Sequence, residues 1–451
     1  MNDHLIDFTG DLSETTACSS IISVDTKCSS VNDSDVDVSL RLSKKMDNIG
    51  DSLSETLKVL FKAQKYDLAI ALAENFLDTF PSSPFLHNML GEAYAALGKH
   101  NKAVENYESF FKLSIKGADP DYVNSIRSLV HNNLAISYRR IGLFDEADTN
   151  FKRALELDQN FALALNNYGN LLYEQNDILG SKQCFLKSIS IDPSDASAYW
   201  NLLSVVEDTE HAKDLISLSI EQNPNFSLAV KTLAGMLALE GNFEYFDGLA
   251  QAYSSDDAII SSFLWLLSLP RPPKIYFSRW SMFDLAISEA AESRPCYEYG
   301  VWMGNSLRYL MKSFTNGFGF DTFDGLPEDW GPVPKGTYSS FGDVPKIENV
   351  EFIVGRFEET LPDFFSTHRD KAGLINFDAD LYSSTACALH WSADIIDSDT
   401  VLVFDEFIVN EGWKNDEYKA LMEYCDKHSL SMDVIAASIF TKQVVCKLMD
   451  R

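Results

Sequence analysis

Apolar and small residues recur with helical spacing between about residues 51 and 258, and the pattern returns after 34 residues. One unit contains Leu134, Ala135, Tyr138, Gly142, Ala147, Phe151 and Ala154. The next unit contains Tyr168, Gly169, Leu172, Asn176, Ser181, Phe185 and Ser188. Each pair of matched positions is 34 residues apart, so the pattern predicts consecutive helical hairpins of the same size.

The residue types in these units suit helices that stack on one another. Small residues allow the two helices of a unit to approach closely, and aromatic residues fill the space beside them. The same register continues upstream through Leu90, Gly91 and Tyr94, with weaker units at both ends. The array therefore resembles the tetratricopeptide repeat (TPR) family, and we expect an all-α solenoid of about six units over residues 51–258.

Three asparagines fall at one position of successive units, namely Asn133, Asn167 and Asn201. In a TPR superhelix this position is expected to face the concave groove, where side-chain amides bind the backbone of an extended peptide. The array is thus a candidate binding module for a protein or peptide partner. The alternative is that these asparagines are only common polar residues of the helix surface and bind no peptide.

A different pattern begins near Arg271, where prolines mark a boundary and short β-branched or aromatic runs alternate with helical stretches. The predicted strands are 296–299, 317–320, 350–354, 373–377, 400–404, 434–438 and 443–448. Strands that alternate with helices predict an α/β domain with a mainly parallel sheet, and the last two strands predict an antiparallel edge hairpin. We therefore expect a linker over 259–273 and an α/β domain over 274–451.

The first predicted strand ends at a turn with two glycines, Gly300 and Gly304, preceded by the acid Glu298, and all three are candidate cofactor-binding residues. This arrangement is typical of the nucleotide-binding turn of doubly wound sheets, where glycine allows a tight turn and a close approach to the ligand. Trp302 stands where a further glycine would let a pyrophosphate lie against the backbone. The turn therefore favours a nucleoside without phosphates, such as S-adenosylmethionine, over a dinucleotide; the alternative is a turn without a ligand.

The next two strands also end in candidate cofactor residues. Asp321 ends the second strand and is placed to accept hydrogen bonds from ribose hydroxyls. Phe357 and Glu358 follow the third strand, where the ring can cover an adenine and the carboxylate can accept from its amino group. The alternative for Glu358 is that it caps the following helix.

The fourth and fifth strands end in paired acids, Asp378 with Asp380 and Asp405 with Glu406. The carboxyl ends of parallel strands meet at one edge of a sheet, so these carboxylates are expected to converge. Converging carboxylates repel unless a cation or a proton intervenes, and oxygen ligands suit Mg²⁺. The alternative is that these acids bind substrate or cap helices.

Taken in order, these motifs resemble the macrocin O-methyltransferase family of class I S-adenosylmethionine-dependent methyltransferases, over about residues 274–450. The resemblance implies a Rossmann-like fold with one antiparallel strand, and methyl transfer to a hydroxyl of a sugar or other natural product. It also implies that Asp378, Asp405 and Glu406 bind Mg²⁺, and Asp378 is the candidate catalytic residue. Glu406 departs from the family pattern, which has a second Asp there.

Composition limits the remaining choices. The 451-residue chain carries 67 Asp and Glu against 37 Lys and Arg, and this excess of acid disfavours nucleic acid as a partner. Residues 1–50 are expected to form a disordered acidic tail. We expect no secretory signal, because no apolar region follows Met1, and no membrane span, because the longest apolar run, 258–270, is too short. The seven widely spaced cysteines favour reduced thiols, so we expect a cytoplasmic location.

The sequence therefore predicts an O-methyltransferase of a sugar, glycan or other natural product, joined to a TPR module. Tyr382 and Trp413 are the expected substrate contacts, because they lie in or beside loops near the predicted site. Two alternatives remain. The methyl acceptor is a protein or peptide held in the TPR groove, or the chain is a scaffold whose methyltransferase fold is inactive.

Overall fold

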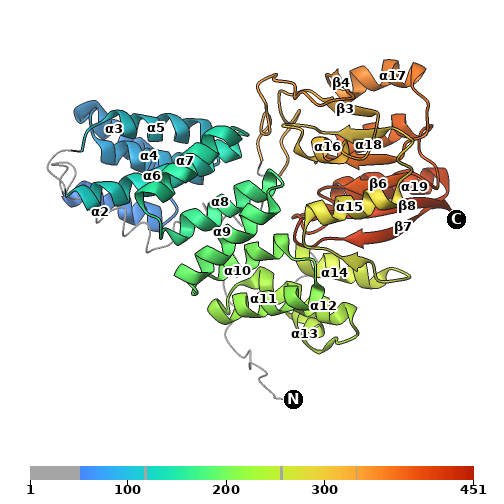
Figure 1. The fold of residues 1–451 in the computed structure, drawn as a ribbon, viewed down its shortest axis with the longest axis horizontal. Helices are drawn as coiled ribbons and strands as arrows, with labels where there is room; N and C mark the ends of the chain where they lie inside the picture. Colours follow the sequence, from blue (N-terminus) through green and yellow to red (C-terminus); the bar gives the residue numbers. More distant parts are fainter. Residues whose placement is uncertain (1–50, 116–118, 254–256, 332) are drawn as a thin grey trace.

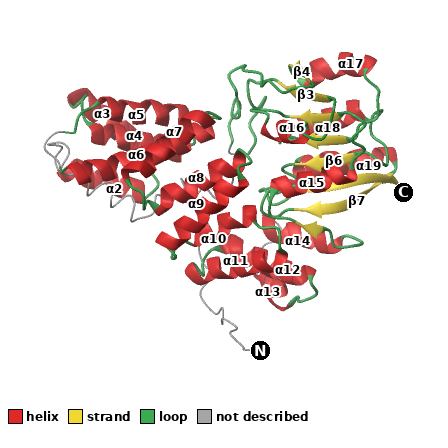
Figure 2. Cartoon of the chain, in the orientation of Figure 1, coloured by secondary structure: helices red, strands yellow, loops and turns green. Residues whose placement is uncertain are grey.

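The computed structural model describes residues 51–115, 119–253, 257–331 and 333–451 (Figure 1). The predicted acidic tail, residues 1–50, lies outside the described residues. A helical half is followed along the chain by a half that contains a sheet (Figure 2). This division agrees with the two predicted types of hydrophobic pattern.

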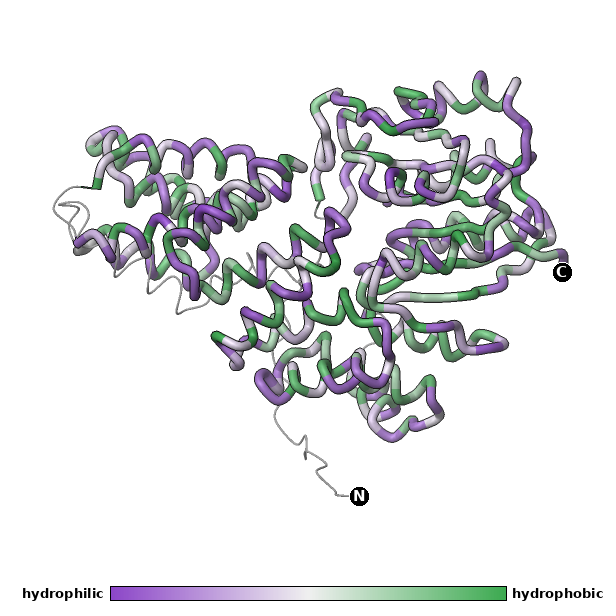
Figure 3. Tube along the Cα trace, viewed as in Figure 1, coloured by the Kyte–Doolittle hydropathy of each residue, from purple (hydrophilic) through white to green (hydrophobic). Residues whose placement is uncertain are grey.

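The helical half consists of antiparallel helix pairs from α2 to α13. Their bounds are α2 Asp51–Lys62, α3 Tyr66–Thr79, α4 Pro84–Ala96, α5 His100–Lys112, α6 Pro120–Arg140, α7 Phe144–Leu157, α8 Ala162–Glu174, α9 Ile178–Ile191, α10 Ala196–Leu202, α11 Thr209–Gln222, α12 Ser227–Leu239 and α13 Glu244–Ala252. Figure 3 shows hydrophobic and hydrophilic residues alternating along these helices, as expected for helices with one buried face.

The repeated small and aromatic positions form the contact within each helix pair. A Cβ atom at Gly91 would lie 2.4 Å from the Tyr107 ring, and one at Gly169 would lie 2.6 Å from the Phe185 ring. Tyr107 and Phe185 are fully buried. The small residue therefore makes room for the aromatic ring of the second helix, which is the physical basis of the predicted repeat.

The second half contains an eight-stranded mixed sheet with the order β1-β7-β8-β6-β5-β2-β3-β4. The strands are β1 Lys274–Ile275, β2 Cys296–Tyr299, β3 Gly317–Asp321, β4 Val350–Val354, β5 Leu374–Phe377, β6 Val401–Phe404, β7 Leu430–Ala437 and β8 Val444–Asp450. The helices of this half are α15 Arg279–Glu289, α16 Asn305–Leu310, α17 Phe357–Thr367, α18 Tyr382–Ser392 and α19 Glu417–His428. Strands β2 to β6 pair in parallel, and β8 runs antiparallel to both β6 and β7.

The two strands of the predicted edge hairpin, β7 and β8, are antiparallel as expected, but they do not lie at the edge of the sheet. The two-residue strand β1 pairs in parallel with β7 and covers its outer side. A strand of two residues is too short to produce an alternating pattern in the sequence.

A row of aromatic rings crosses the neighbouring parallel strands β6, β5, β2 and β3 at their carboxyl ends. Phe320, Tyr299, Phe377 and Phe404 are partners in the sheet register. Their ring centroids are separated by 4.8, 5.4 and 4.7 Å, with nearly parallel planes. The next residue on each strand points to the same sheet edge, so this row holds four candidate site positions at one level.

One hydrophobic core runs through both halves of the chain. It includes Trp200 and Phe263 from the helical half together with Tyr299 and Phe404 from the sheet. Most of the predicted linker over 259–273 is helical in the structure. Helix α14 (Ala258–Ser268) occupies it, and Phe263 of this helix is buried. The repeats and the sheet are therefore packed against each other and not merely tethered.

Within the described ranges, no helix combines the length and the apolar character that crossing a membrane requires.

Candidate functional site

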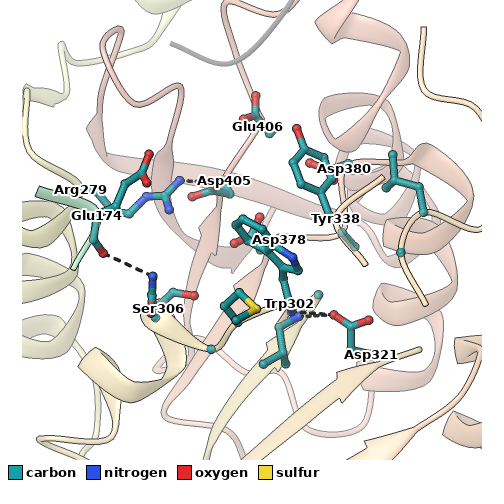
Figure 4. Close-up of a pocket in the computed structure, with 18 of the residues that line it drawn as sticks. Glu174, Arg279, Trp302, Ser306, Asp321, Tyr338, Asp378, Asp380, Asp405 and Glu406 are labelled. Atoms are coloured by element: carbon teal, nitrogen blue, oxygen red, sulfur yellow. Dashed lines mark hydrogen bonds and ion pairs between the residues drawn. The ribbon is translucent and has the colours of Figure 1, made fainter. Parts of the chain in front are cut away.

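A cavity of about 300 Å³ lies between the sheet edge and the repeats, at the carboxyl ends of the parallel strands (Figure 4). This edge is where α/β folds generally place their ligands. The sheet half contributes the glycine turn and the acids that follow the strands. The helical half contributes Arg139, Arg140, Phe144, Asn170, Tyr173, Glu174 and Ser204.

The glycine turn between β2 and α16 lines this cavity as predicted. Gly300 and Gly304 have φ angles of +85° and +72°, which glycine adopts without strain. Trp302 also has a positive φ of +48°. Its ring packs edge-on against Phe144 of the repeats and against Tyr338, with centroids 6.0 and 5.7 Å away. The turn is thus held from two sides.

Asp321 lines the cavity, but its carboxylate mainly binds the glycine turn. Oδ2 accepts hydrogen bonds from the backbone N–H groups of Val301 and Trp302 at 2.7 and 2.8 Å, and Oδ1 accepts from Phe323 N at 2.7 Å. A carboxylate has about four acceptor positions, so about one remains. These backbone contacts leave too few acceptor positions for the expected pair of ribose hydroxyls, and the binding of a ribose by Asp321 stays a prediction.

Glu298 does not line the cavity, which corrects its predicted role as a direct cofactor ligand. Its side chain is fully buried beneath the turn. Oε1 accepts from Ser306 Oγ at 2.8 Å, and Oε2 accepts from Asn376 Nδ2 at 3.1 Å. Burial raises the pKa of Glu298 to about 8. Glu298 therefore supports the turn by joining the start of α16 to β5.

Phe357 and Glu358 both line the cavity at the start of α17. Phe357 is half-buried and packs edge-on against Tyr299, with the centroids 5.5 Å apart. Glu358 is exposed and lies 3.3 Å from Arg356. Both residues are thus placed where the sequence predicts them, beside the end of β4.

Asp378 and Asp380 follow β5 and face the cavity (Figure 4). Within the described ranges, neither carboxylate has a hydrogen bond or an ion pair, and both are partly accessible. Burial and the nearby Asp405 raise the pKa of Asp378, and burial and Glu406 raise the pKa of Asp380. A carboxylate of this kind accepts a proton more readily than an exposed one.

Asp405 and Glu406 follow β6 and are each paired with a cation of the chain. Asp405 Oδ2 lies 2.7 Å from Arg279 Nη2, and Glu406 Oε2 lies 3.1 Å from Lys442 Nζ. In the described part of the chain, no group of three or more His, Cys, Asp and Glu residues is arranged to hold a metal ion. The predicted Mg²⁺ ligand set of Asp378, Asp405 and Glu406 therefore does not fit a divalent ion in this arrangement.

The two predicted substrate contacts lie outside the cavity, which corrects that prediction. Trp413 is 2% exposed, and its Nε1 donates to Ser261 Oγ at 2.9 Å. Tyr382 is not among the residues that line the cavity, and its hydroxyl donates to Glu423 at 2.6 Å. Trp413 packs against the helix that the sequence placed in a linker, so its burial was not visible from local sequence.

The asparagines of the repeats form contacts within the array. Asn167 Nδ2 donates to Asn132 Oδ1 at 3.1 Å, and Asn201 Nδ2 donates to Asn166 Oδ1 at 3.0 Å. Asn133 Oδ1 accepts from Asn132 at 3.0 Å. Asn167 and Asn201 are buried. For Asn167 and Asn201, the prediction that they offer their amides to a bound peptide is therefore corrected, because they join consecutive repeats. Asn133 is half-buried and bonds to its neighbour in the same helix, so its predicted role stays a prediction.

Sequence reasoning missed the contribution of the repeats to the cavity. The Tyr173 hydroxyl accepts from Arg279 N at 2.8 Å, and Trp280 Nε1 donates to the Tyr173 carbonyl at 2.8 Å. Asn305 Nδ2 donates to the Glu174 carbonyl at 3.4 Å. These contacts join residues that are more than 100 positions apart, and no local motif reports them.

Comparison with known proteins supports the repeats directly. Two family models described as tetratricopeptide repeat match residues 82–160 and 132–196. This part of the chain consists of TPR units, which typically bind other proteins. The human protein O-mannosyl-transferase TMTC3 is 27% identical over 201 residues, which cover 42% of this chain and 21% of that protein. The chain thus matches about a fifth of that relative's length.

Two of the solved structures that resemble this chain are described as methyltransferases. NovP, an O-methyltransferase, is 18% identical, covers 38% of this chain and 80% of its own, and has a TM-score of 0.31. The calicheamicin methyltransferase CalS11 is 16% identical, covers 54% of this chain and 94% of its own, and also has a TM-score of 0.31.

Proposed function

We propose that the chain is an S-adenosylmethionine-dependent O-methyltransferase that acts on a hydroxyl of a sugar, glycan or other natural product. The observation that carries this proposal is the glycine turn, which borders the same cavity as the open carboxylates of Asp378 and Asp380. A cofactor turn and a proton acceptor in one cavity are the two parts that this reaction needs.

The cofactor half of the cavity is formed by the turn and by residues after β3 and β4. Asp321 has an acceptor position for one ribose hydroxyl, and Phe357 and Glu358 are placed to contact the base. The indole Nε1 of Trp302 is buried without a hydrogen-bond partner among the described residues. A bound ligand with an acceptor atom would satisfy this donor.

The acceptor half lies between the sheet edge and the repeats. When bound, S-adenosylmethionine supplies a methyl group whose bond to sulfur breaks as the bond to the acceptor oxygen forms. Asp378 takes the proton of the attacking hydroxyl, so the products are a methyl ether, S-adenosylhomocysteine and a protonated carboxyl. Arg140 and Glu174 face the remaining volume from the repeats and select the acceptor.

Titration calorimetry of the full chain with S-adenosylhomocysteine tests the cofactor half. We expect one site per chain. Gly304→Val should abolish binding, because Gly304 has a φ of +72° and a Cβ there would lie 3.1 Å from Pro345 and Ile347. Gly248→Ala, an exposed helical position with open space, is the matched control. Absence of binding to the unaltered chain would refute the cofactor assignment.

Methyl transfer from labelled cofactor tests the acceptor half. The label should appear in the small-molecule or glycan fraction of a cell extract. Asp378→Asn should retain S-adenosylhomocysteine binding and lower the transfer rate by about 10²-fold or more. Label found only in protein would favour a protein acceptor instead.

A further inference from the structure

We infer that Arg279 and Lys442 take the place of a divalent ion beside Asp405 and Glu406, so that this chain transfers methyl groups without a bound metal. The inference rests on the proposed function for the reaction itself. Its structural part, the exclusion of a divalent ion by two cations of the chain, stands on the geometry of the cavity alone.

Arg279 is fixed beside Asp405 by contacts from three parts of the chain. Its Nη2 lies 2.7 Å from Asp405 Oδ2, and the Asp405 side chain is 5% exposed. Gln443 Nε2 donates to the other oxygen, Asp405 Oδ1. The Tyr173 hydroxyl holds the Arg279 backbone N–H at 2.8 Å. Both carboxylate oxygens of Asp405 are therefore engaged by donors of the protein.

Lys442 has the corresponding role at Glu406. Its Nζ lies 3.1 Å from Glu406 Oε2, and the two side chains are 5% and 10% exposed. Asn410 Nδ2 donates to the same oxygen. A buried ammonium that loses its carboxylate partner is strongly unfavourable, so this pair resists separation.

A divalent ion would have to displace both cations to reach these acids. Mg²⁺ requires about six oxygen ligands in near-octahedral geometry, and it would add two positive charges beside an arginine and a lysine. The two cations already balance two of the four carboxylates. Asp378 and Asp380 remain open for the sulfonium of the cofactor and the proton of the acceptor.

The binding of Mn²⁺ to the full chain tests this inference without any measurement of activity. Free Mn²⁺ gives a six-line electron paramagnetic resonance spectrum that bound Mn²⁺ loses. With S-adenosylhomocysteine present, the unaltered chain should leave the spectrum unchanged up to about 1 mM Mn²⁺, a range where weak carboxylate sites fill. The double variant Arg279→Met and Lys442→Met should bind Mn²⁺ at least about ten times more tightly.

The matched control is the double variant Arg294→Met and Lys447→Met. It removes the same two charge types from ion pairs with Asp397 and Glu289, whose side chains are not part of the cavity. This control should not gain Mn²⁺ binding. If the site variant does not fold, the single variants Arg279→Met and Lys442→Met replace it, and each should show a smaller gain.

Saturable Mn²⁺ binding by the unaltered chain would overturn the inference. A folded site variant that gains no Mn²⁺ binding would also overturn it, since the two cations would then not be what excludes the ion. Failure of the proposed function is distinguishable, because it appears as absent S-adenosylhomocysteine binding and leaves the Mn²⁺ result standing.

Discussion

A Cβ atom at Gly300 would lie 1.8 Å from the carbonyl oxygen of Asp378. The glycine turn after β2 and the acidic segment after β5 therefore touch through their backbones, and the contact leaves no room for a side chain at position 300. Gly300 also has a φ of +85°, so its position needs glycine for both steric and conformational reasons.

Gly300→Ala should therefore destabilise the fold by at least about 2 kcal/mol and abolish S-adenosylhomocysteine binding. Urea unfolding and titration calorimetry measure the two effects. Gly248→Ala in α13, where a Cβ meets nothing within 4 Å, should leave binding intact and change stability by at most about 1 kcal/mol. Normal cofactor binding by the Gly300 variant would contradict the described turn.

Glu298→Gln should flatten the dependence of stability on pH. The carboxyl has a pKa of about 8 in the folded chain against 4.5 as its ordinary value, so between these values the folded state binds more protons than the unfolded state. Folding stability must then fall as pH rises through this window. Glutamine has nearly the same shape and keeps one acceptor oxygen for the Ser306 hydroxyl, but it does not titrate. Part of the dependence of stability on pH should remain in this variant, because other buried acids also titrate.

Urea unfolding at several pH values between about 5 and 8 measures this change. Glu289→Gln is the control, since this side chain is 42% exposed and lies 3.3 Å from Lys447. A slope for Glu298→Gln equal to that of the unaltered chain would mean that Glu298 is ionised in the folded state.

Trp413→Phe should reduce stability and leave the acceptor KM unchanged. The buried Nε1–H of Trp413 donates to Ser261 Oγ, and the smaller ring also leaves a cavity in the shared core. The expected loss is about 1–3 kcal/mol. Tyr382→Phe, at a half-buried position on α18 whose hydroxyl bond is exposed, should lose much less. An increase of the acceptor KM in the Trp413 variant would restore it as a substrate contact.

Tyr173→Phe should destabilise the junction between the repeats and the site. It removes the oxygen that accepts from Arg279 N, which costs about 1–3 kcal/mol when the donor is left buried. Tyr199→Phe is a control from the repeats, since its hydroxyl bond at 3.2 Å is exposed. Equal unfolding free energies for the two variants would show that the Tyr173 contact does not matter.

The sequence predicted what depends on neighbouring residues. The 34-residue period and the aromatic strand ends are local patterns, and they placed the helix pairs, seven of the eight strands and the acids at the sheet edge. The glycine turn was recognisable for the same reason, because two glycines and a strand lie within a few positions.

The sequence did not predict what depends on distant partners. Arg279 reaches Asp405 across 126 positions, and Asn201 is satisfied by Asn166 of the previous repeat. The acids were therefore correctly placed, but their charge partners were not. The asparagines likewise follow the repeat period, which does not show whether an amide faces a groove or another asparagine.

The hydrophobic core that joins Trp200 and Phe263 to the rings of the sheet has a consequence for protein engineering. The sheet half cannot be transferred to another protein by cutting at residue 273, because the cut would expose a hydrophobic face on each fragment. A graft that keeps the cavity and the shared core has to carry α6 to α14 with it. The repeats nearest the sheet thus belong structurally to the sheet half. Within the described ranges, α2 to α5 contribute no residue to the cavity, so these outer repeats are the ones that can be exchanged.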